Sequence, residues 1–87
     1  MEDVFNYMEI WVEEYMNKFL KEYDVCTCDS CKKDIFALAL NNLPPYYVVT
    51  QKGKIMAKYQ IKEYQFETDI ILAVTNAIEI VKKNPNH

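Results

Sequence analysis

The chain has 87 residues, carries a formal net charge of −3 at pH 7, and is 51% hydrophobic and 26% charged. This length excludes two independent domains, because each half would bury too little apolar surface to fold, so we predict a single domain over residues 1–87. The composition excludes a disordered chain. All ten basic residues are lysines, so the chain lacks the guanidinium fork by which most proteins read duplex DNA, and we expect no strong nucleic-acid binding.

The N-terminal stretch predicts an amphipathic helix over residues 2–22. Apolar side chains recur there at steps of three and four along two neighbouring lines, with polar side chains opposite. One line comprises Val4, Met8, Trp11, Tyr15 and Phe19, the other Phe5, Val12, Met16 and Leu20, and the polar side Asn6, Glu9, Glu13 and Asn17. The apolar arc is wider than one small core requires, so we expect a second packing partner, most simply another copy of the chain.

The same stretch bears on localisation. The start "MEDVFNYMEIWVEEY" lacks the basic residues and short apolar core of a signal peptide. The longest apolar run, "IILAV" at residues 70–74, is far shorter than the roughly 18 residues of a membrane span. We therefore expect a cytoplasmic protein that does not cross a membrane.

A second helix is expected after the segment "YDVCTCDS", which has no helical period. Asp29 or Ser30 is its predicted N-cap. Its apolar line consists of Cys31, Ile35 and Leu38. The double proline at positions 44 and 45 ends the helix, and one of the asparagines at 41 and 42 is expected to close it in the left-handed conformation.

A short β element is expected next. The run "YYVVTQKGKIMAKY" has β-branched and aromatic residues on both sides of Gly53, the only glycine, which predicts a hairpin between about 46–50 and 54–58. Two strands alone are marginally stable, so we expect them to lie against helices or to pair across a dimer.

The C-terminal part predicts a third helix over residues 59–83. One side of it carries the apolar residues Ile61, Tyr64, Ile70, Val74, Ala77, Ile78 and Val81. Further apolar residues lie elsewhere around it, namely Ile71, Leu72, Ala73 and Ile80, so we expect its middle to be buried on nearly all sides. The predicted fold class is mainly α, a small three-helix domain with a short β-hairpin or extended segment.

The three cysteines fall within six positions, at Cys26, Cys28 and Cys31. In an extended segment, residues two apart point to the same side, so the first two sulfurs can meet at one point. The third lies in the first turn of the predicted helix, where backbone N–H groups favour the thiolate that a metal needs. Three sulfurs can thus converge on a tetrahedral zinc ion at a Zn–S distance of ~2.3 Å, which predicts a zinc-binding domain.

Other interpretations of the cluster stay open. Cys28 and Cys31 could form a redox disulfide, although no βαβ pattern surrounds them and Cys26 would have no role. Cys31 could be an ordinary core residue, and the three could also be free thiols that lie close by chance.

The motif leaves the fourth zinc ligand undefined. Candidates are His87, which is the only histidine, the carboxylates of Asp24, Asp29 or Asp34, a water, or a group from a second subunit. Asp34 lies about one helical turn beyond Cys31, so it could instead accept a hydrogen bond near the metal. The sequence has no second histidine and no evident nucleophile pair, and we therefore expect no enzymatic activity.

The segment "CTCDSCKKDIFALALNNLPPYYV", residues 26–48, resembles the central motif of the late competence development protein ComFB family. That motif is approximately C-x-C-x-x-C-x-x-D-[VI]-x-A-L-A-L-N-x-L-P-P-x-Y-V. The matching residues are Cys26, Cys28, Cys31, Asp34, Ile35, Ala37, Leu38, Ala39, Leu40, Asn41, Leu43, Pro44, Pro45, Tyr47 and Val48. The motif covers about a quarter of the chain, and the flanking amphipathic helices are similar in length and order to those of the family.

The resemblance implies a cytoplasmic, mostly helical zinc-binding domain that forms a homodimer and is encoded in some bacteria beside the machinery for DNA uptake. It implies no reaction. Members with a further cysteine toward the C-terminus can complete the zinc site with it, and this chain has none. We therefore predict a zinc site formed by Cys26, Cys28, Cys31 and His87.

Two functions are expected from these observations. The first is a non-enzymatic zinc-binding homodimer that acts as a regulatory or scaffold module linked to late competence. The alternative is a receptor for a cyclic dinucleotide, cyclic di-GMP or cyclic di-AMP, since the resemblance also implies an association with this signalling. Lysine charge and tyrosine stacking would hold such a ligand, at Lys52, Lys54, Lys58 and Tyr59. The acidic balance of the chain argues against strong binding of single-stranded DNA.

Overall fold

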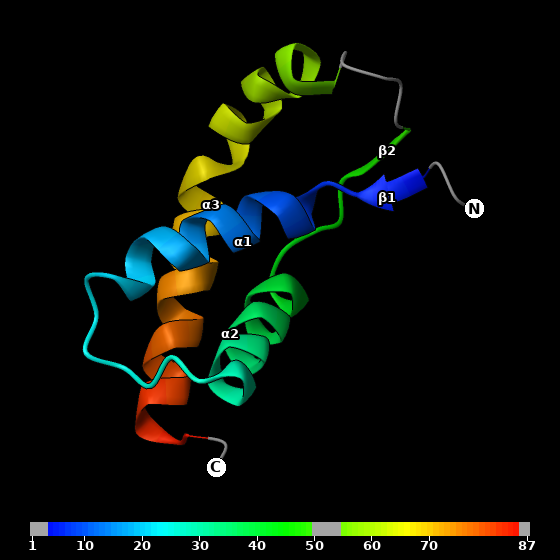
Figure 1. Ribbon diagram of the computed structural model, residues 1–87. Coiled ribbons are helices and arrows are strands. Elements are labelled where there is room, and N and C mark those ends of the chain that lie inside the picture. The colour runs from blue at the N-terminus through cyan, green and yellow to red at the C-terminus, as the bar shows by residue number, and fades with distance from the viewer. Residues whose placement is uncertain (1–3, 50–54, 86–87) are drawn as a thin grey trace.

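The computed structural model describes residues 4–49 and 55–85, and within the second range it gives the helical backbone of residues 55–64 and the side chains of residues 65–85. Five elements follow one another along this part of the chain: β1 (Val4–Asn6), α1 (Met8–Leu20), α2 (Asp29–Asn41), β2 (Tyr47–Val49) and α3 (Ile55–Lys83) (Figure 1). The helices and the two-stranded antiparallel sheet confirm the predicted mainly α fold class. None of the described helices combines the length and the hydropathy that a membrane crossing requires.

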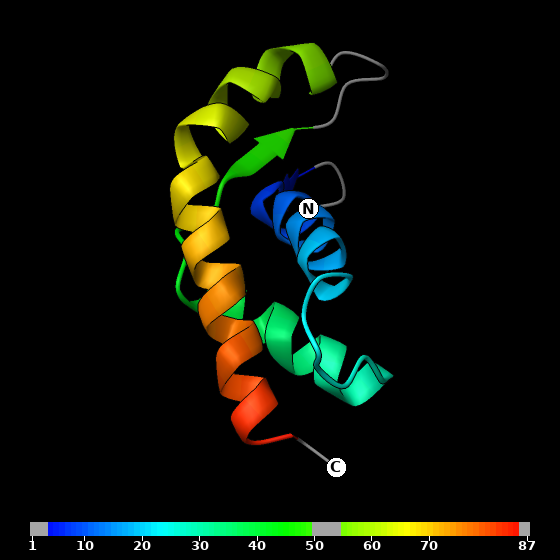
Figure 2. The same ribbon diagram turned by 90° about the vertical axis from the view of Figure 1, so that its left-hand side faces the viewer.

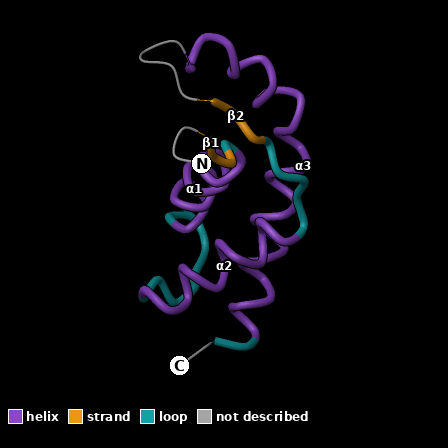
Figure 3. The backbone as a smooth tube through the Cα atoms, turned by 90° about the vertical axis from the view of Figure 1, so that its right-hand side faces the viewer, coloured by secondary structure: helices purple, strands orange, loops and turns teal. Residues whose placement is uncertain are grey.

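The long helix α3 is the element on which the other two helices pack. In Figure 2, α1 and α2 both lie on one side of α3, and the opposite view in Figure 3 shows the same arrangement. The sheet lies toward the N-terminal half of α3, whereas the loop between α1 and α2 lies toward its C-terminal end (Figure 1). The molecule is elongated, with extents of 39, 26 and 20 Å.

The core is formed by one face of each helix, together with Tyr7 and Val48 at the sheet. The buried residues of the helices are Met8, Trp11, Val12, Met16 and Leu20 from α1, Cys31, Ile35 and Ala39 from α2, and Ile70, Ala73, Val74, Ala77, Ile78 and Val81 from α3. Their spacing of three and four confirms the helical period that the sequence indicated for each of the three segments. Of the two predicted apolar lines of α1, the one that contains Val12 and Met16 faces the core more fully, since Tyr15 and Phe19 are only partly buried.

The expectation that α3 is buried on nearly all sides was wrong. Leu72 is 55% exposed and Ile80 is 48% exposed, because α1 and α2 cover only one side of the helix. Ala73, which was predicted to lie on the same outer side as Leu72 and Ile80, belongs to the core instead. The side chains of Ile61 and Tyr64 lie outside the described residues.

The predicted hairpin was correct in its first strand and wrong in its second. The segment at 46–50 contains β2, but of the predicted second strand residues 55–58 belong to α3, which begins at Ile55. The helix formers Met56, Ala57 and Lys58 extend the period of α3 toward its N-terminus and favour this outcome. The partner of β2 is β1, which comes from the start of the chain.

The N-terminal helix is shorter than predicted because its first residues form β1. The register pairs Val4 with Val49 and Phe5 with Val48, and α1 begins only at Met8. A β-branched and an aromatic residue fit a pleated strand as well as a helix, so the local period could not distinguish the two. The deciding interaction is the distant strand β2, which supplies backbone hydrogen bonds to β1.

Asn6 joins β1, α1 and the segment before β2. Its Oδ1 accepts hydrogen bonds from the backbone N–H of Met8, at 3.1 Å, and from that of Tyr46, at 2.7 Å. The backbone N–H of Tyr7 in turn donates to the carbonyl of Tyr46 at 2.7 Å. Asn6 therefore accepts hydrogen bonds both from the first turn of α1 and from the segment that leads into β2. The prediction that Asn6 lies on the solvent-facing side of a helix was wrong.

An aromatic cluster packs beside this junction. The buried ring of Trp11 lies 5.0 Å from the ring of Tyr7, 5.5 Å from that of Tyr46 and 6.1 Å from that of Phe66, measured between centroids. These rings come from the end of β1, the segment before β2, α1 and α3. Such ring contacts stabilise a fold beyond the burial of apolar surface. Here they connect α1 and α3 to the two segments that form the sheet.

The ends of α2 are close to those predicted. The helix begins at Asp29 with Cys28 as its N-cap, one residue before the expected caps, and it ends at Asn41, before the double proline. Asn42 follows with φ −104° rather than in the predicted left-handed conformation. Its side-chain amide donates instead to the carbonyl of Leu38 at 2.9 Å, which satisfies one carbonyl of the last turn.

We expect the change Asn6→Ala to lower the free energy of unfolding by about 1–3 kcal/mol, because it leaves two backbone N–H groups without their acceptor. Asn6→Asp keeps a carboxylate oxygen in the same place and should cost much less. Urea denaturation monitored by the fluorescence of Trp11 measures both variants. Equal stability of Asn6→Ala and the unchanged protein would show that water replaces the side chain without cost.

Candidate metal centre

The three cysteines come from the junction between the α1–α2 loop and α2. Cys26 lies in the loop, Cys28 is the N-cap residue with an extended backbone (φ −67°, ψ 164°), and Cys31 lies in the first turn of the helix. The backbone N–H of Lys32 donates to the carbonyl of Cys28 at 2.9 Å, which closes that turn. The extended backbone before the helix and the helical turn after it aim the cysteines at a common point, as the spacing predicted.

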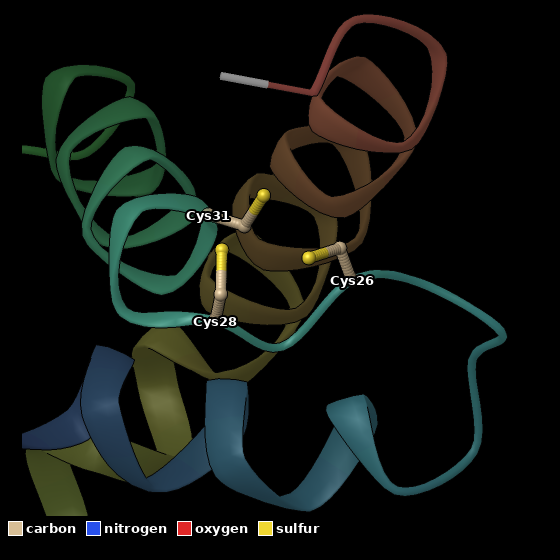
Figure 4. Close-up of side chains that lie close together, drawn as sticks. All are labelled: Cys26, Cys28 and Cys31. Atoms are coloured by element: carbon tan, nitrogen blue, oxygen red, sulfur yellow. The ribbon is translucent and has the colours of Figure 1, made fainter. Parts of the chain in front are cut away.

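The sulfur atoms of Cys26, Cys28 and Cys31 all lie within 4.8 Å of one another. Figure 4 shows the three side chains pointing toward the space between the loop and the first turn of α2. None of the three forms a disulfide, and they differ in exposure: Cys28 is exposed, Cys26 is half-buried and Cys31 is fully buried. One face of the cluster is thus fixed in the core, and the other is open to an ion from solution.

The electrostatic surroundings favour a thiolate at the exposed position. Interaction with the backbone N–H of Cys31, and next with the thiol of Cys26, lowers the pKa of Cys28 below the ordinary value of a cysteine. Desolvation opposes this shift but does not outweigh it. The start of a helix carries unpaired N–H groups and the positive end of its dipole, which is the physical origin of the effect.

These residues fit a soft metal ion. A tetrahedral zinc ion with Zn–S distances of ~2.3 Å places its sulfurs roughly 3.8 Å apart, only about 1 Å closer than the widest separation here. Thiolate ligands select zinc and other soft ions over magnesium or calcium. The cluster therefore has the donor type and the spacing of a metal centre.

The remaining predicted ligands are placed as follows. His87 lies outside the described residues. The metal-ligating group found among the described side chains contains the three sulfurs and does not include Asp24, Asp29 or Asp34. Figures 1 and 4 show the C-terminal end of α3 on the side of the molecule that carries the cysteine loop.

The predicted nucleotide site consists of residues whose side chains are not described. Lys52 and Lys54 lie outside the described residues, and Lys58 and Tyr59 belong to the part of α3 whose side chains are not described. The cyclic dinucleotide site therefore stays a prediction from the sequence.

The role of Cys28 as the N-cap of α2 was not foreseen, because cysteine is not among the usual capping residues.

Comparison with known proteins assigns the family. Residues 5–85 match the model of the family described as late competence development protein ComFB. The chain is 27% identical over 82 residues to the competence protein ComFB of Bacillus subtilis (strain 168), which covers 93% of this chain and 84% of that protein. The solved structure of the late competence protein ComFB from Bacillus subtilis superposes with a TM-score of 0.77 at 26% identity, covering 95% of this chain and 92% of the other. With its cysteine motif and helical fold, the chain belongs to the late competence development protein ComFB family.

Proposed function

We propose that this protein is a non-enzymatic, zinc-binding homodimer that acts in the cytoplasm as a regulatory or scaffold module of late competence. The observation that supports this most directly is the convergence of three cysteine sulfurs at the start of α2. The likeness to competence proteins supports the cellular role. A reducing compartment would keep the thiols available for a metal instead of a disulfide.

The residues of the site explain what a metal would do for the fold. Cys31 belongs to the core cluster, whereas Cys26 lies in the irregular loop that joins α1 to α2. Zinc, when bound, would crosslink these segments and neutralise the thiolates. The loop would then be fixed against the first turn of α2, so binding of the metal and folding of the loop would be coupled. His87 is the proposed fourth ligand, since α3 ends beside the cluster.

Native mass spectrometry of the untagged protein should show one zinc ion per subunit within a dimer. Cys28→Ser should lose the ion, because two thiolates hold zinc poorly, and its melting temperature should fall by roughly 4–8 °C for each kcal/mol of lost stability. Thr27→Ser, between two of the cysteines, is the matched control and should keep the ion. His87→Ala should also lose zinc or bind it more weakly.

Three results would each contradict a different part of the proposed function. A metal-free protein with three reduced thiols would contradict the zinc-binding function. Full zinc occupancy in His87→Ala would contradict the proposed fourth ligand and leave the role of the three cysteines intact. If the protein binds zinc but its melting temperature does not change when a chelator removes the zinc, the structural role of the metal is contradicted.

In metal-free protein, we expect iodoacetamide to alkylate Cys28 first and Cys31 last. Cys28 is exposed and its pKa is lowered, so a larger fraction is thiolate near neutral pH, whereas Cys31 is fully buried. The rate at Cys28 should fall as the pH drops through its pKa, with a midpoint below that of an unfolded cysteine peptide. Peptide mapping by mass spectrometry after timed quenching measures the order, and fast alkylation of Cys31 would contradict the buried placement.

A further inference from the structure

The side of α3 that α1 and α2 leave uncovered carries an ordered row of exposed residues. We call it the outer stripe, and it consists of Asp69, Leu72, Asn76, Ile80 and Lys83. All five are exposed, and Leu72 and Ile80 are among the large apolar residues that the described chain leaves in water. An exposed apolar pair on one face of a long helix, flanked by charges, is typical of a surface that packs on another helix.

The outer stripe is symmetric about Asn76. Leu72 lies four residues before it and Ile80 four after it, and Asp69 and Lys83 lie seven residues before and after. Positions four and seven residues away return to within about 40° and 20° of the same direction on an α-helix, so the five side chains share one face. Apolar residues therefore occupy equivalent positions on both sides of the centre, and opposite charges occupy the two outer positions.

From this pattern we propose that the outer stripe is the surface on which a second copy of the chain packs, with the two α3 helices antiparallel about a two-fold axis at Asn76. This inference rests on the homodimer of the proposed function and names its interface. The arrangement brings Leu72 level with the partner's Ile80, and Asp69 level with the partner's Lys83. Each contact occurs twice, as a two-fold interface requires.

The charges on this face favour the antiparallel arrangement over the parallel one. A parallel pair in register would place Asp69 against the partner's Asp69 and Lys83 against the partner's Lys83, which is repulsive at both ends. The antiparallel pair replaces both repulsions with ion pairs. Glu79 would lie level with the partner's Ala73, so it would not oppose another carboxylate.

The outer stripe forms one wall of a groove that has room for side chains of the partner. This groove of about 580 Å³ lies between α3 and the segment that follows α2, and Asp69, Leu72, Asn76 and Ile80 are on its α3 side. Its other side is formed by Asn42, Leu43 and Pro44. An apolar side chain from a second helix that enters this groove would contact Leu43, which is only half-buried in the single chain.

A second exposed apolar surface competes for the same role. On the sheet, Val4, Tyr47 and Val49 are exposed, and the register places Val4 directly opposite Val49. This surface is apolar, but its described residues carry no charge that would select an orientation of a partner. The outer stripe combines apolar area with complementary charge and therefore fits a second copy better.

Sedimentation velocity of the zinc-loaded, full-length protein tests the interface. We expect Leu72→Lys and Ile80→Lys each to raise the dimer dissociation constant by roughly tenfold to a hundredfold, since each change removes a buried apolar side chain from both subunits. Ile10→Lys, an exposed apolar position on α1, is the control and should leave the dimer unchanged. Far-UV circular dichroism and melting of each variant verify that the fold is retained.

A charge exchange provides an independent measurement on polar positions. Asp69→Lys and Lys83→Asp should each weaken the dimer, and the double variant should restore it, because the exchange reproduces both ion pairs in reverse.

A cross-link tests the position of the two-fold axis. Asn76→Cys should form an intersubunit disulfide across the axis under mild oxidation. Lys82→Cys, which is exposed but lies off the outer stripe, should not.

The outcomes separate this inference from the proposed function. If the unchanged protein is still monomeric at roughly millimolar concentration, both the homodimer and its interface would be overturned. A dimer that survives Leu72→Lys but is lost in Val49→Lys would assign the interface to the sheet and overturn only the inference. Failure of Asn76→Cys to crosslink in a dimer would overturn the two-fold axis proposed here.

Discussion

The whole domain depends on the burial of one face of α3. The buried residues of α1 and α2 pack against Ile70, Val74 and Ile78, and neither of the shorter helices could bury its apolar face by itself. Because the chain is small, this single core supplies most of the apolar burial available to it. The two ends of the domain are held by different interactions. One end is held by the sheet and the aromatic cluster, and the cysteine loop lies at the other end.

The two ends differ in the chemistry that holds them. At one end, Asn6 and Trp11 connect distant segments through hydrogen bonds and ring contacts that form as soon as the chain is folded. At the other end, the α1–α2 loop is irregular, and three thiols lie where a metal ion would hold it to α2. The first end is therefore independent of metal supply, while the second would respond to it.

The parts of the fold that the sequence predicted are those set by local pattern. The burial of Ile35 and Val74 follows from helical periods, and the approach of Cys28 and Cys31 follows from their spacing at the start of a helix. The strand partner of Val48 could not be found in this way, because Phe5 is 43 positions away and lies in a segment whose local period is equally helical. Pairing across the chain is decided by the packing of the whole domain, which a local pattern does not contain.

The exposure of Leu72 shows the opposite error. Counting apolar residues around α3 predicted burial on all sides, but a chain of this size has only two other helices in its described part, and both lie on the same side. The number of helices available to cover a surface is a property of the chain length and of the topology. The periodic pattern indicated correctly that this face is apolar, and the error was to infer burial within the same chain from apolar character alone.

The order of the elements along the chain has a consequence for biosynthesis. α3 follows α1 and α2, so during translation both shorter helices emerge from the ribosome before the face that they pack against has emerged. β1 likewise emerges before its partner β2. The nascent chain therefore exposes the apolar faces of α1 and α2, together with three thiols, until α3 has also left the ribosome. Apolar surface exposed in this way favours aggregation until the core has closed.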